Sequence, residues 1–278
     1  MDNLSHWNDW AEKYGSKLRA TTKANSIKRI EIFELAKAIT YLLEQSKKKD
    51  SDLTILEVGC GNGYNTIAIK EMFGKSIVHG IDFSSEMINN SKKLTSKTVF
   101  KNSDSIGFYV GDAKELDKQK LLLDEYDIIF TDRCLINLLG EGELEMAVES
   151  IFSKLKKGGA GIFIENFINS RNNQDNLRQI IGLERRKIPE FNKFICEESF
   201  LNLIGNYSSV INFKCISSLH DLILYLLTPS LNDGEVDYES PIVEKVTDLI
   251  INSHKKLNYE MNISPDIGQN SICICVNN

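Results

Sequence analysis

The chain has 278 residues, of which 42% are hydrophobic and 26% charged, as in ordinary globular proteins. Its net charge of −6 disfavours a nucleic-acid partner, because affinity for phosphates depends largely on Lys and Arg. No apolar stretch approaches the roughly 20 residues that span a bilayer, and the N-terminal MDNLSHWNDW lacks the basic flank and apolar run of a signal peptide. We therefore expect a cytoplasmic protein with neither a membrane nor a nucleic-acid partner, of undetermined oligomeric state.

Strands and helices alternate along most of the chain. Residues 26–45 carry apolar side chains at helical spacing and predict a long first helix. After it, strands are predicted at 53–58, 76–82, 106–110, 126–131 and 160–165, and helices at 64–73, 85–94 and 143–156. This alternation is typical of an α/β fold whose parallel sheet is covered on both faces.

The C-terminal part of the chain is less regular. Two more strands are predicted at 210–216 and 271–276, separated by an amphipathic block at 219–262 that is too long for a hairpin loop. We expect one domain with a doubly wound, seven-stranded, mostly parallel sheet, N-terminal helices and a helical insert before the last strand. Its predicted parts are an N-terminal lid (1–50), a core (51–216), a substrate cap (217–270) and the final strand (271–278).

A glycine-rich loop, Glu57-Val58-Gly59-Cys60-Gly61-Asn62-Gly63, follows the first predicted sheet strand and opens a helix. Ligands of doubly wound sheets bind at the carboxyl ends of the strands, where such a loop lets the backbone approach them closely. A dinucleotide fingerprint requires the spacing G-x-G-x-x-G, but Tyr64 stands where its third glycine would be. This spacing disfavours a nicotinamide-dependent dehydrogenase.

The pattern E-x-G-x-G-x-G resembles the first motif of class I, Rossmann-like methyltransferases, which use S-adenosylmethionine (SAM). This resemblance implies that Asp82 binds the ribose hydroxyls, that Asp112 meets the adenine amino group and that Asp132 lies where methyl group and substrate meet. The alternative is that these acids only cap helices. The cofactor residues that the resemblance implies are Tyr14, Arg19, Glu57, Gly59, Cys60, Gly61, Gly63, Asp82, Phe83, Met87, Asp112, Ala113, Asp132 and Arg133.

Other stretches extend the resemblance over nearly the whole chain. HWNDWAEKYGSKLRATTK, TDRCLINL, SLHDLILYLLTP and NDGEVDY resemble a bacterial group of SAM-dependent methyltransferases associated with small-molecule and surface-carbohydrate modification. The implied partner is a small-molecule acceptor such as a nucleotide sugar.

Aromatic residues near the N-terminus suggest a lid. Trp7, Trp10 and Tyr14 share one helical face, either for packing alone or to close over the cofactor. Arg19 follows, and its guanidinium would suit the carboxylate of SAM.

Methylation of a hydroxyl requires a group that takes up the departing proton. His220 is the predicted base, because imidazole accepts a proton near neutral pH, although its place among apolar residues also fits a structural role. Asp132, Arg133 and Asn137 follow the fourth strand, and Arg133 alternatively pairs with a nearby acid. The predicted catalytic residues are His220, Asp132 and Asn137, and the predicted substrate residues are Asn137, Glu165, Asn166, Asn169 and Tyr225.

No metal is predicted, because the six cysteines form no CxxC pair and the four histidines are scattered. A metal would be held only if Asp132, Glu165 and His220 converged.

The sequence therefore predicts O-methylation of a sugar or nucleotide sugar for surface glycan synthesis, with N-methylation of a small amine as the alternative. A protein or RNA methyltransferase and a non-catalytic SAM-binding module are less favoured readings.

Overall fold

The computed structural model describes residues 3–98, 100, 105–261 and 263–278. Positions 1–2 of the predicted lid and position 262 of the predicted cap lie outside this range. No helix in the described part of the chain is long and apolar enough to cross a membrane.

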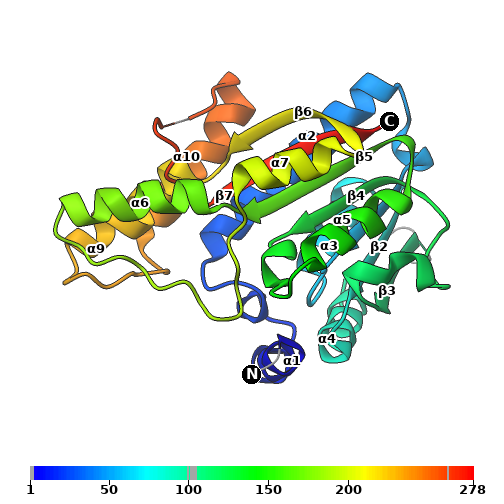
Figure 1. Ribbon diagram of the computed structural model, residues 1–278, viewed down its shortest axis with the longest axis horizontal. Helices are drawn as coiled ribbons and strands as arrows, with labels where there is room; N and C mark the ends of the chain where they lie inside the picture. The colour runs from blue at the N-terminus through cyan, green and yellow to red at the C-terminus, as the bar shows by residue number, and fades with distance from the viewer. Residues whose placement is uncertain (1–2, 99, 101–104, 262) are drawn as a thin grey trace.

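The strands form one seven-stranded sheet in the order β3-β2-β1-β4-β5-β7-β6, which confirms the predicted fold class (Figure 1). All neighbouring strands pair in parallel except β7, which is antiparallel to both β5 and β6. The strands are β1 (Thr54–Val58), β2 (Ile77–Asp82), β3 (Ile106–Val110), β4 (Tyr126–Asp132), β5 (Leu155–Asn166), β6 (Ser208–Cys215) and β7 (Asn270–Asn277).

Helices cover both faces of the sheet because the central strands are apolar on both sides. In β4, Ile129 packs toward α5 (Glu143–Ser153) and α7 (Glu197–Gly205). Its neighbours Ile128 and Phe130 point the other way, toward α2 (Asn25–Ser46) and α3 (Tyr64–Met72). The long first helix predicted at 26–45 is α2.

Three segments differ from the predicted elements. The helix predicted at 143–156 ends at Ser153, because Leu155 already pairs with Tyr126 as the first residue of β5. Helices α6 (Ile168–Ile180) and α7 lie where no element was predicted. The block at 219–262 folds as α8 (Ser218–Leu222), a π-helical turn (Ile223–Leu227), α9 (Thr228–Ser230) and α10 (Pro241–Leu257).

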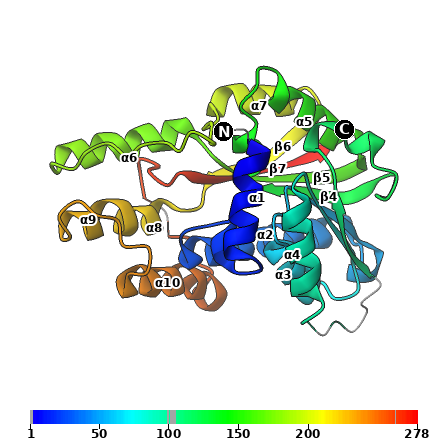
Figure 2. The ribbon, with the colours of Figure 1, turned by 90° about the horizontal axis from the view of Figure 1, so that it is seen from below.

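These C-terminal helices and α6 form a second lobe to one side of the sheet (Figure 1). The lobe has its own core around Leu224, Tyr225 and Val243. It is joined to α2 by ion pairs from Arg29 to Glu244 (2.8 Å) and Asp248 (2.5 Å). At the other end of the chain, α1 (Asn3–Tyr14) crosses the molecule beside α4 (Ser85–Thr95), as Figure 2 shows.

Candidate active site

A cavity of about 430 Å³ opens at the carboxyl ends of β1, β2, β3 and β4. One residue at the end of each strand lines the cavity: Gly59 follows β1, Asp82 ends β2, Asp112 follows β3 and Asp132 ends β4. This is the edge at which doubly wound sheets bind ligands. The predicted site residues that line the cavity are Glu57, Gly59, Cys60, Gly61, Asp82, Phe83, Met87, Asp112, Ala113, Asp132, Arg133 and Asn137.

The glycine loop is packed too tightly for side chains at all three of its glycines, and the two that line the cavity show this clearly. Gly59 and Gly61 have φ angles of 75° and 52°, in the left-handed region that favours glycine. A Cβ on Gly59 would lie 2.3 Å from Cys134 Sγ, and one on Gly61 would lie 2.7 Å from Thr21 Cγ2. The loop thus leaves its backbone open toward the cavity. Gly63, which precedes α3, does not line the cavity.

The carboxylates after β2 and β3 are both anchored by backbone amides. Asp82 accepts hydrogen bonds from the N–H groups of Gly61 (2.8 Å) and Ser84 (2.9 Å), and burial raises its pKa to about 6. Asp112 accepts a bond from Lys114 N–H (2.9 Å). The capping alternative therefore holds for Asp112, which caps the 3-10 helix Ala113–Lys118, but not for Asp82, because Ser84 caps α4; both acids also line the cavity.

A buried ion-pair network surrounds Asp132. Lys28 of α2 donates to Asp132 Oδ2 and lies 2.9 Å from Glu31, and Asn65 Nδ2 donates to the same Asp132 oxygen at 2.7 Å. Burial alone would raise the pKa of Asp132, but Lys28 and Arg133 outweigh it and lower the pKa. The carboxylate therefore stays charged at neutral pH.

Arg133 continues this network. Its Nε lies 2.9 Å from Glu31 Oε1, so the predicted alternative of a structural ion pair describes its contacts, while its side chain also lines the cavity. Glu31 in turn accepts a bond from Asn270 (2.7 Å). The network thus links α2, β4 and β7 at the floor of the cavity.

Glu57 is a buried acid of a different kind. It accepts hydrogen bonds from Asn65 (3.0 Å) and Thr66 but has no cationic partner within ion-pair distance among the described residues. Burial raises its pKa to about 8. Glu57 is therefore mainly protonated, and so neutral, at pH 7.

Four oxygens of cavity-lining residues are buried without a hydrogen-bond partner in the described structure: the Oδ1 atoms of Asn62, Asn65, Asp132 and Asn137. Buried acceptors of this kind normally find a donor. SAM carries such a donor in its ammonium group, and its positive charges suit acceptor oxygens. The set of acceptor oxygens in the cavity therefore fits SAM.

Helix α1 closes the front of the cavity and contributes Asn3, Leu4 and Trp7 to its lining. Its Asn8 accepts a bond from Ser84 Oγ (2.6 Å), and its Ala11 carbonyl accepts one from Asn90 (3.0 Å). Of the three aromatic residues of the predicted lid, Trp7 lines the cavity, whereas Trp10 and Tyr14 do not.

Two predicted cofactor residues near α1 do not line the cavity. The ring of Tyr14 packs on Trp10 at 5.2 Å, and the exposed Arg19 donates to the Lys23 carbonyl (3.1 Å). The cationic side chains that do line the cavity are Lys28, Lys114 and Arg133.

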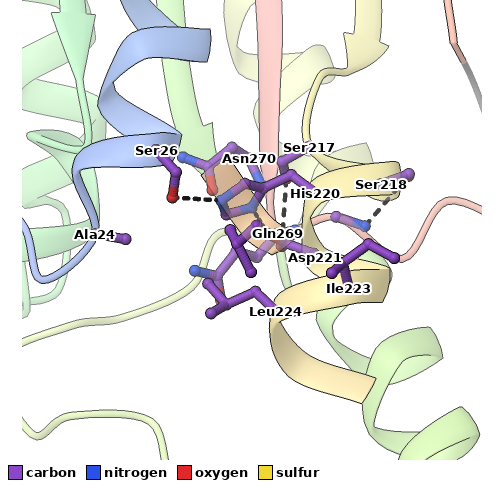
Figure 3. Close-up of polar contacts among 12 residues, drawn as sticks. Ala24, Ser26, Ser217, Ser218, His220, Asp221, Ile223, Leu224, Gln269 and Asn270 are labelled. Atoms are coloured by element: carbon purple, nitrogen blue, oxygen red, sulfur yellow. Dashed lines mark hydrogen bonds and ion pairs between the residues drawn. The ribbon is translucent and has the colours of Figure 1, made fainter. Parts of the chain in front are cut away.

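His220 does not line the cavity. Figure 3 shows its ring between Ser26 Oγ (2.9 Å from Nε2) and Asp221 Oδ1 (2.8 Å from Nδ1), and only 1% of the residue is exposed. This position corrects the prediction of a catalytic base: both ring nitrogens are occupied, and the imidazole joins α8 to α2. Asp132, Glu165 and His220 thus form no metal site; none is found among the described residues.

The predicted substrate residues other than Asn137 also lie outside the cavity lining, because the chain turns away from this edge after β5. Glu165 accepts bonds from Thr131 Oγ1 (2.7 Å) and Leu135 N–H (3.1 Å), so it shapes the loop after β4 from beneath. Asn166 donates to the Gln269 carbonyl, Asn169 accepts from Glu197 N–H, and Tyr225 lies in the core of the second lobe. No described residue of the predicted substrate cap, 217–270, lines the cavity.

Several lining residues were not predicted, among them Lys28, Asn65, Leu138, Leu139 and Glu143. The position of Asn65 could have been predicted from the sequence, because it lies in the first turn of the helix that the glycine loop opens. For Lys28 the only signal was misleading, because Lys and Glu three residues apart are typical of an exposed helix face.

Comparison with known proteins connects this site with one family. A family model described as "Methyltransferase domain" matches residues 49–212, more than half of the chain. The malonyl-[acyl-carrier protein] O-methyltransferase of Priestia megaterium is 27% identical over 114 residues, which cover 41% of this chain and 37% of the relative. The protein of the same name from Bacillus anthracis is 27% identical over 130 residues, 47% of this chain and 44% of the relative. The chain thus spans less than half the length of these curated relatives.

Solved structures share the fold at lower sequence identity. Magnesium protoporphyrin IX methyltransferase from Synechocystis PCC 6803, with bound S-adenosylhomocysteine, aligns with a TM-score of 0.57 at 14% identity and covers 99% of this chain and 96% of that chain. Geranyl diphosphate C-methyltransferase from Streptomyces coelicolor A3(2) aligns with a TM-score of 0.55 at 16% identity, over 88% and 81% of the two chains. With its glycine loop, strand order and matched family model, the chain belongs to the methyltransferase domain family, Rossmann-like enzymes whose cofactor is SAM.

Proposed function

We propose that this chain transfers a methyl group from SAM to a small polar acceptor at the cavity. In the proposed arrangement Asp82 binds the ribose hydroxyls, Asp112 meets the adenine amino group, and the unpaired amide oxygen of Asn62 accepts from the ammonium group. Bound SAM supplies a methyl group on a positively charged sulfur, so the enzyme mainly has to align the acceptor atom with it.

One observation supports a hydroxyl acceptor above the others. Asp132 Oδ2 is held by Lys28 and Asn65, whereas Oδ1 is buried at the cavity without a hydrogen bond to a described residue and has Arg133 Nε 3.6 Å away. A hydroxyl placed against Oδ1 would be oriented by it and would pass its proton to it as the new C–O bond forms. With His220 outside the cavity, Asp132 takes its place as the proposed base.

The resemblance to methyltransferases of small molecules and surface carbohydrates makes a sugar or nucleotide sugar our first candidate acceptor. The second candidate is an acceptor that needs no base, namely a carboxylate or a neutral amine. It is favoured by two observations: no histidine is among the described lining residues, and the curated relatives are named for malonyl-[acyl-carrier protein], whose malonyl group presents a carboxylate.

The test uses purified protein, SAM labelled on its methyl group, and bacterial extract separated into small-molecule, protein and nucleic-acid fractions. Label is expected in the small-molecule fraction, and mild alkali separates a carboxylate acceptor from a hydroxyl or amine acceptor. Methyl esters release labelled methanol, whereas methyl ethers and N-methyl groups retain the label. Label in protein or RNA would contradict the proposed acceptor class, and failure to bind SAM would contradict the proposed activity itself.

A further inference from the structure

Three arginines converge on one tyrosine in the second lobe. Arg171 and Arg178 of α6 are only 1% and 4% exposed. Arg186, from the segment after α6, lies with its guanidinium 3.3 Å from the centre of the Tyr225 ring and remains half-buried. Arginines are seldom buried without acidic partners.

The partners of these arginines are mostly neutral. Arg178 donates to the carbonyls of Glu184 (2.8 Å) and Tyr225, and Arg186 donates to Gln174 Oε1 (2.7 Å). Neither Arg178 nor Arg186 forms an ion pair with any described carboxylate. Each also has guanidinium N–H groups left over, because five donors are available and only one or two nitrogens are used.

Among the described residues, the two carboxylates that interact with the cluster are already engaged. Asp175 pairs with Arg171 (3.1 Å). Asp221 binds His220 Nδ1 (2.8 Å) and Gln269 N–H (2.9 Å). Positive charge therefore exceeds negative charge among these buried groups. Consistent with this, burial and the neighbouring Arg186 lower the pKa values of Arg171 and Arg178.

The hydroxyl group of Tyr225 is a further hydrogen-bond donor among these positively charged arginines. The residue is 6% exposed, and its hydroxyl forms no hydrogen bond with a described residue. Burial raises the pKa of its phenol, against the opposing effect of Arg186, so the hydroxyl keeps its proton at neutral pH. A protonated phenol beside free guanidinium N–H groups is a donor set for an oxyanion.

The cluster borders the cavity through a short series of contacts. The Tyr225 ring lies 6.4 Å from the Tyr238 ring, which Lys23 approaches at 5.9 Å. The preceding residue, Thr22, accepts a bond from Arg133 of the cavity lining (3.4 Å). Tyr225, Tyr238 and Lys23 do not line the cavity, but Tyr225 interacts electrostatically with Arg133, which does.

We propose that Arg186 and the Tyr225 hydroxyl form an oxyanion subsite, backed by the charge of Arg171, that binds a phosphate or carboxylate group of the acceptor. This inference rests on the proposed function for the role of the ligand and narrows its substrate class to anionic small molecules. The subsite itself is testable without methyl transfer.

The experiment measures Tm against inorganic phosphate and against malonate, each compared with chloride at equal ionic strength. For the wild type, a specific rise of about 2–4 °C is expected at ten times the Kd. Arg186→Gln is expected to abolish the rise in Tm. Tyr225→Phe, which keeps the ring, is expected to weaken anion binding and so to raise the apparent Kd at least threefold. A response to phosphate alone identifies a phosphoryl ligand, and a response to malonate alone identifies a carboxylate.

The matched control is Arg185→Gln, because Arg185 is exposed and its side-chain hydrogen bonds to described residues go to Gln179 (3.0 Å) and Asn176 (3.2 Å). It should keep the wild-type response. The proposal is overturned if neither anion raises Tm more than chloride, or if Arg186→Gln and Arg185→Gln respond alike. Calorimetric titration with SAM is run in parallel: intact SAM binding with no anion response defeats the subsite alone, whereas loss of SAM binding in the wild type defeats the proposed function.

Discussion

Charge at the floor of the cavity is balanced by side chains from distant parts of the chain. Lys28, Glu31, Asp132 and Arg133 bring two positive and two negative charges together away from water. Removal of any one of these four side chains destabilises the fold, because it leaves an uncompensated buried charge.

Lys28→Met is therefore expected to lower the free energy of unfolding by about 3 kcal/mol. Adding Asp132→Asn should restore part of that loss, because it removes the unpaired charge. Urea denaturation of the two single variants and the double variant measures the coupling. Simple additivity of the single effects would show that the pair is not coupled.

Glu57 makes stability depend on pH in a stated direction. Its pKa rises from 4.5 to about 8 on folding, so its contribution to stability is fully present below pH 4.5 and is lost as pH rises through about 8. Glu57→Gln should therefore show a smaller fall in Tm between pH 5 and pH 8.5 than the wild type. It should also bind SAM normally at pH 7, because the native side chain is already neutral there. Equal pH profiles would refute the assignment.

His220 connects two helices, so its replacement should affect stability rather than chemistry. His220→Ala removes bonds to Ser26 and Asp221 and leaves both buried groups without that partner. A loss of about 2 kcal/mol in unfolding free energy is expected, with KM and kcat of the folded enzyme nearly unchanged. A hundredfold fall in kcat with normal stability would return His220 to the role of base.

At the scale of elements, α1 is held over the cavity by a segment far along the chain. His6 stacks on Phe191 at 4.0 Å, between α6 and α7, and Trp7 lies near the same ring. The segment from 181 to 196 thus reaches from the second lobe to α1.

Phe191→Ala should loosen α1 and speed the release of SAM several-fold, with a smaller effect on the rate of binding. Stopped-flow displacement of SAM measures both rates. Leu231→Ala serves as control, because Leu231 is 89% exposed and belongs to the second lobe. Unchanged release from Phe191→Ala would mean that α1 is not a lid, and removal of residues 1–24 would then be expected to leave SAM affinity intact.

At the scale of the whole molecule, the matched family region accounts for only part of the cavity. Residues 49–212 supply the glycine loop and the three strand-end acids, whereas Trp7 and Lys28 come from the chain before this region. The second lobe, with Tyr225, lies largely after it. We infer that the cofactor end of the site is the shared part and that specificity for the acceptor comes from the flanking segments.

The charge of the whole molecule bears on the class of acceptor. With a net charge of −6, the protein should bind tRNA only weakly, and without the steep loss of affinity with salt that phosphate contacts produce. Filter binding at 50 and 200 mM salt checks this expectation. Micromolar affinity with a steep salt dependence would instead favour an RNA acceptor.

The sequence by itself determined the sheet and which strand-end residues meet at its carboxyl edge. The alternation of apolar runs and the glycine loop are local patterns, and in a parallel sheet the ends of successive strands meet at one edge. Asp82, Asp112 and Asp132 could therefore be placed together without knowledge of the packing.

Only the tertiary structure decided which flanking side chains reach the cavity. Lys28 looked like an exposed helix residue and is buried on Asp132, whereas His220 looked like a base and is enclosed by Ser26 and Asp221. Burial and hydrogen-bond partners depend on contacts between segments more than 100 residues apart, as the 104 residues between Lys28 and Asp132 show. No local pattern encodes such contacts, because they arise only when the helices pack on the finished sheet.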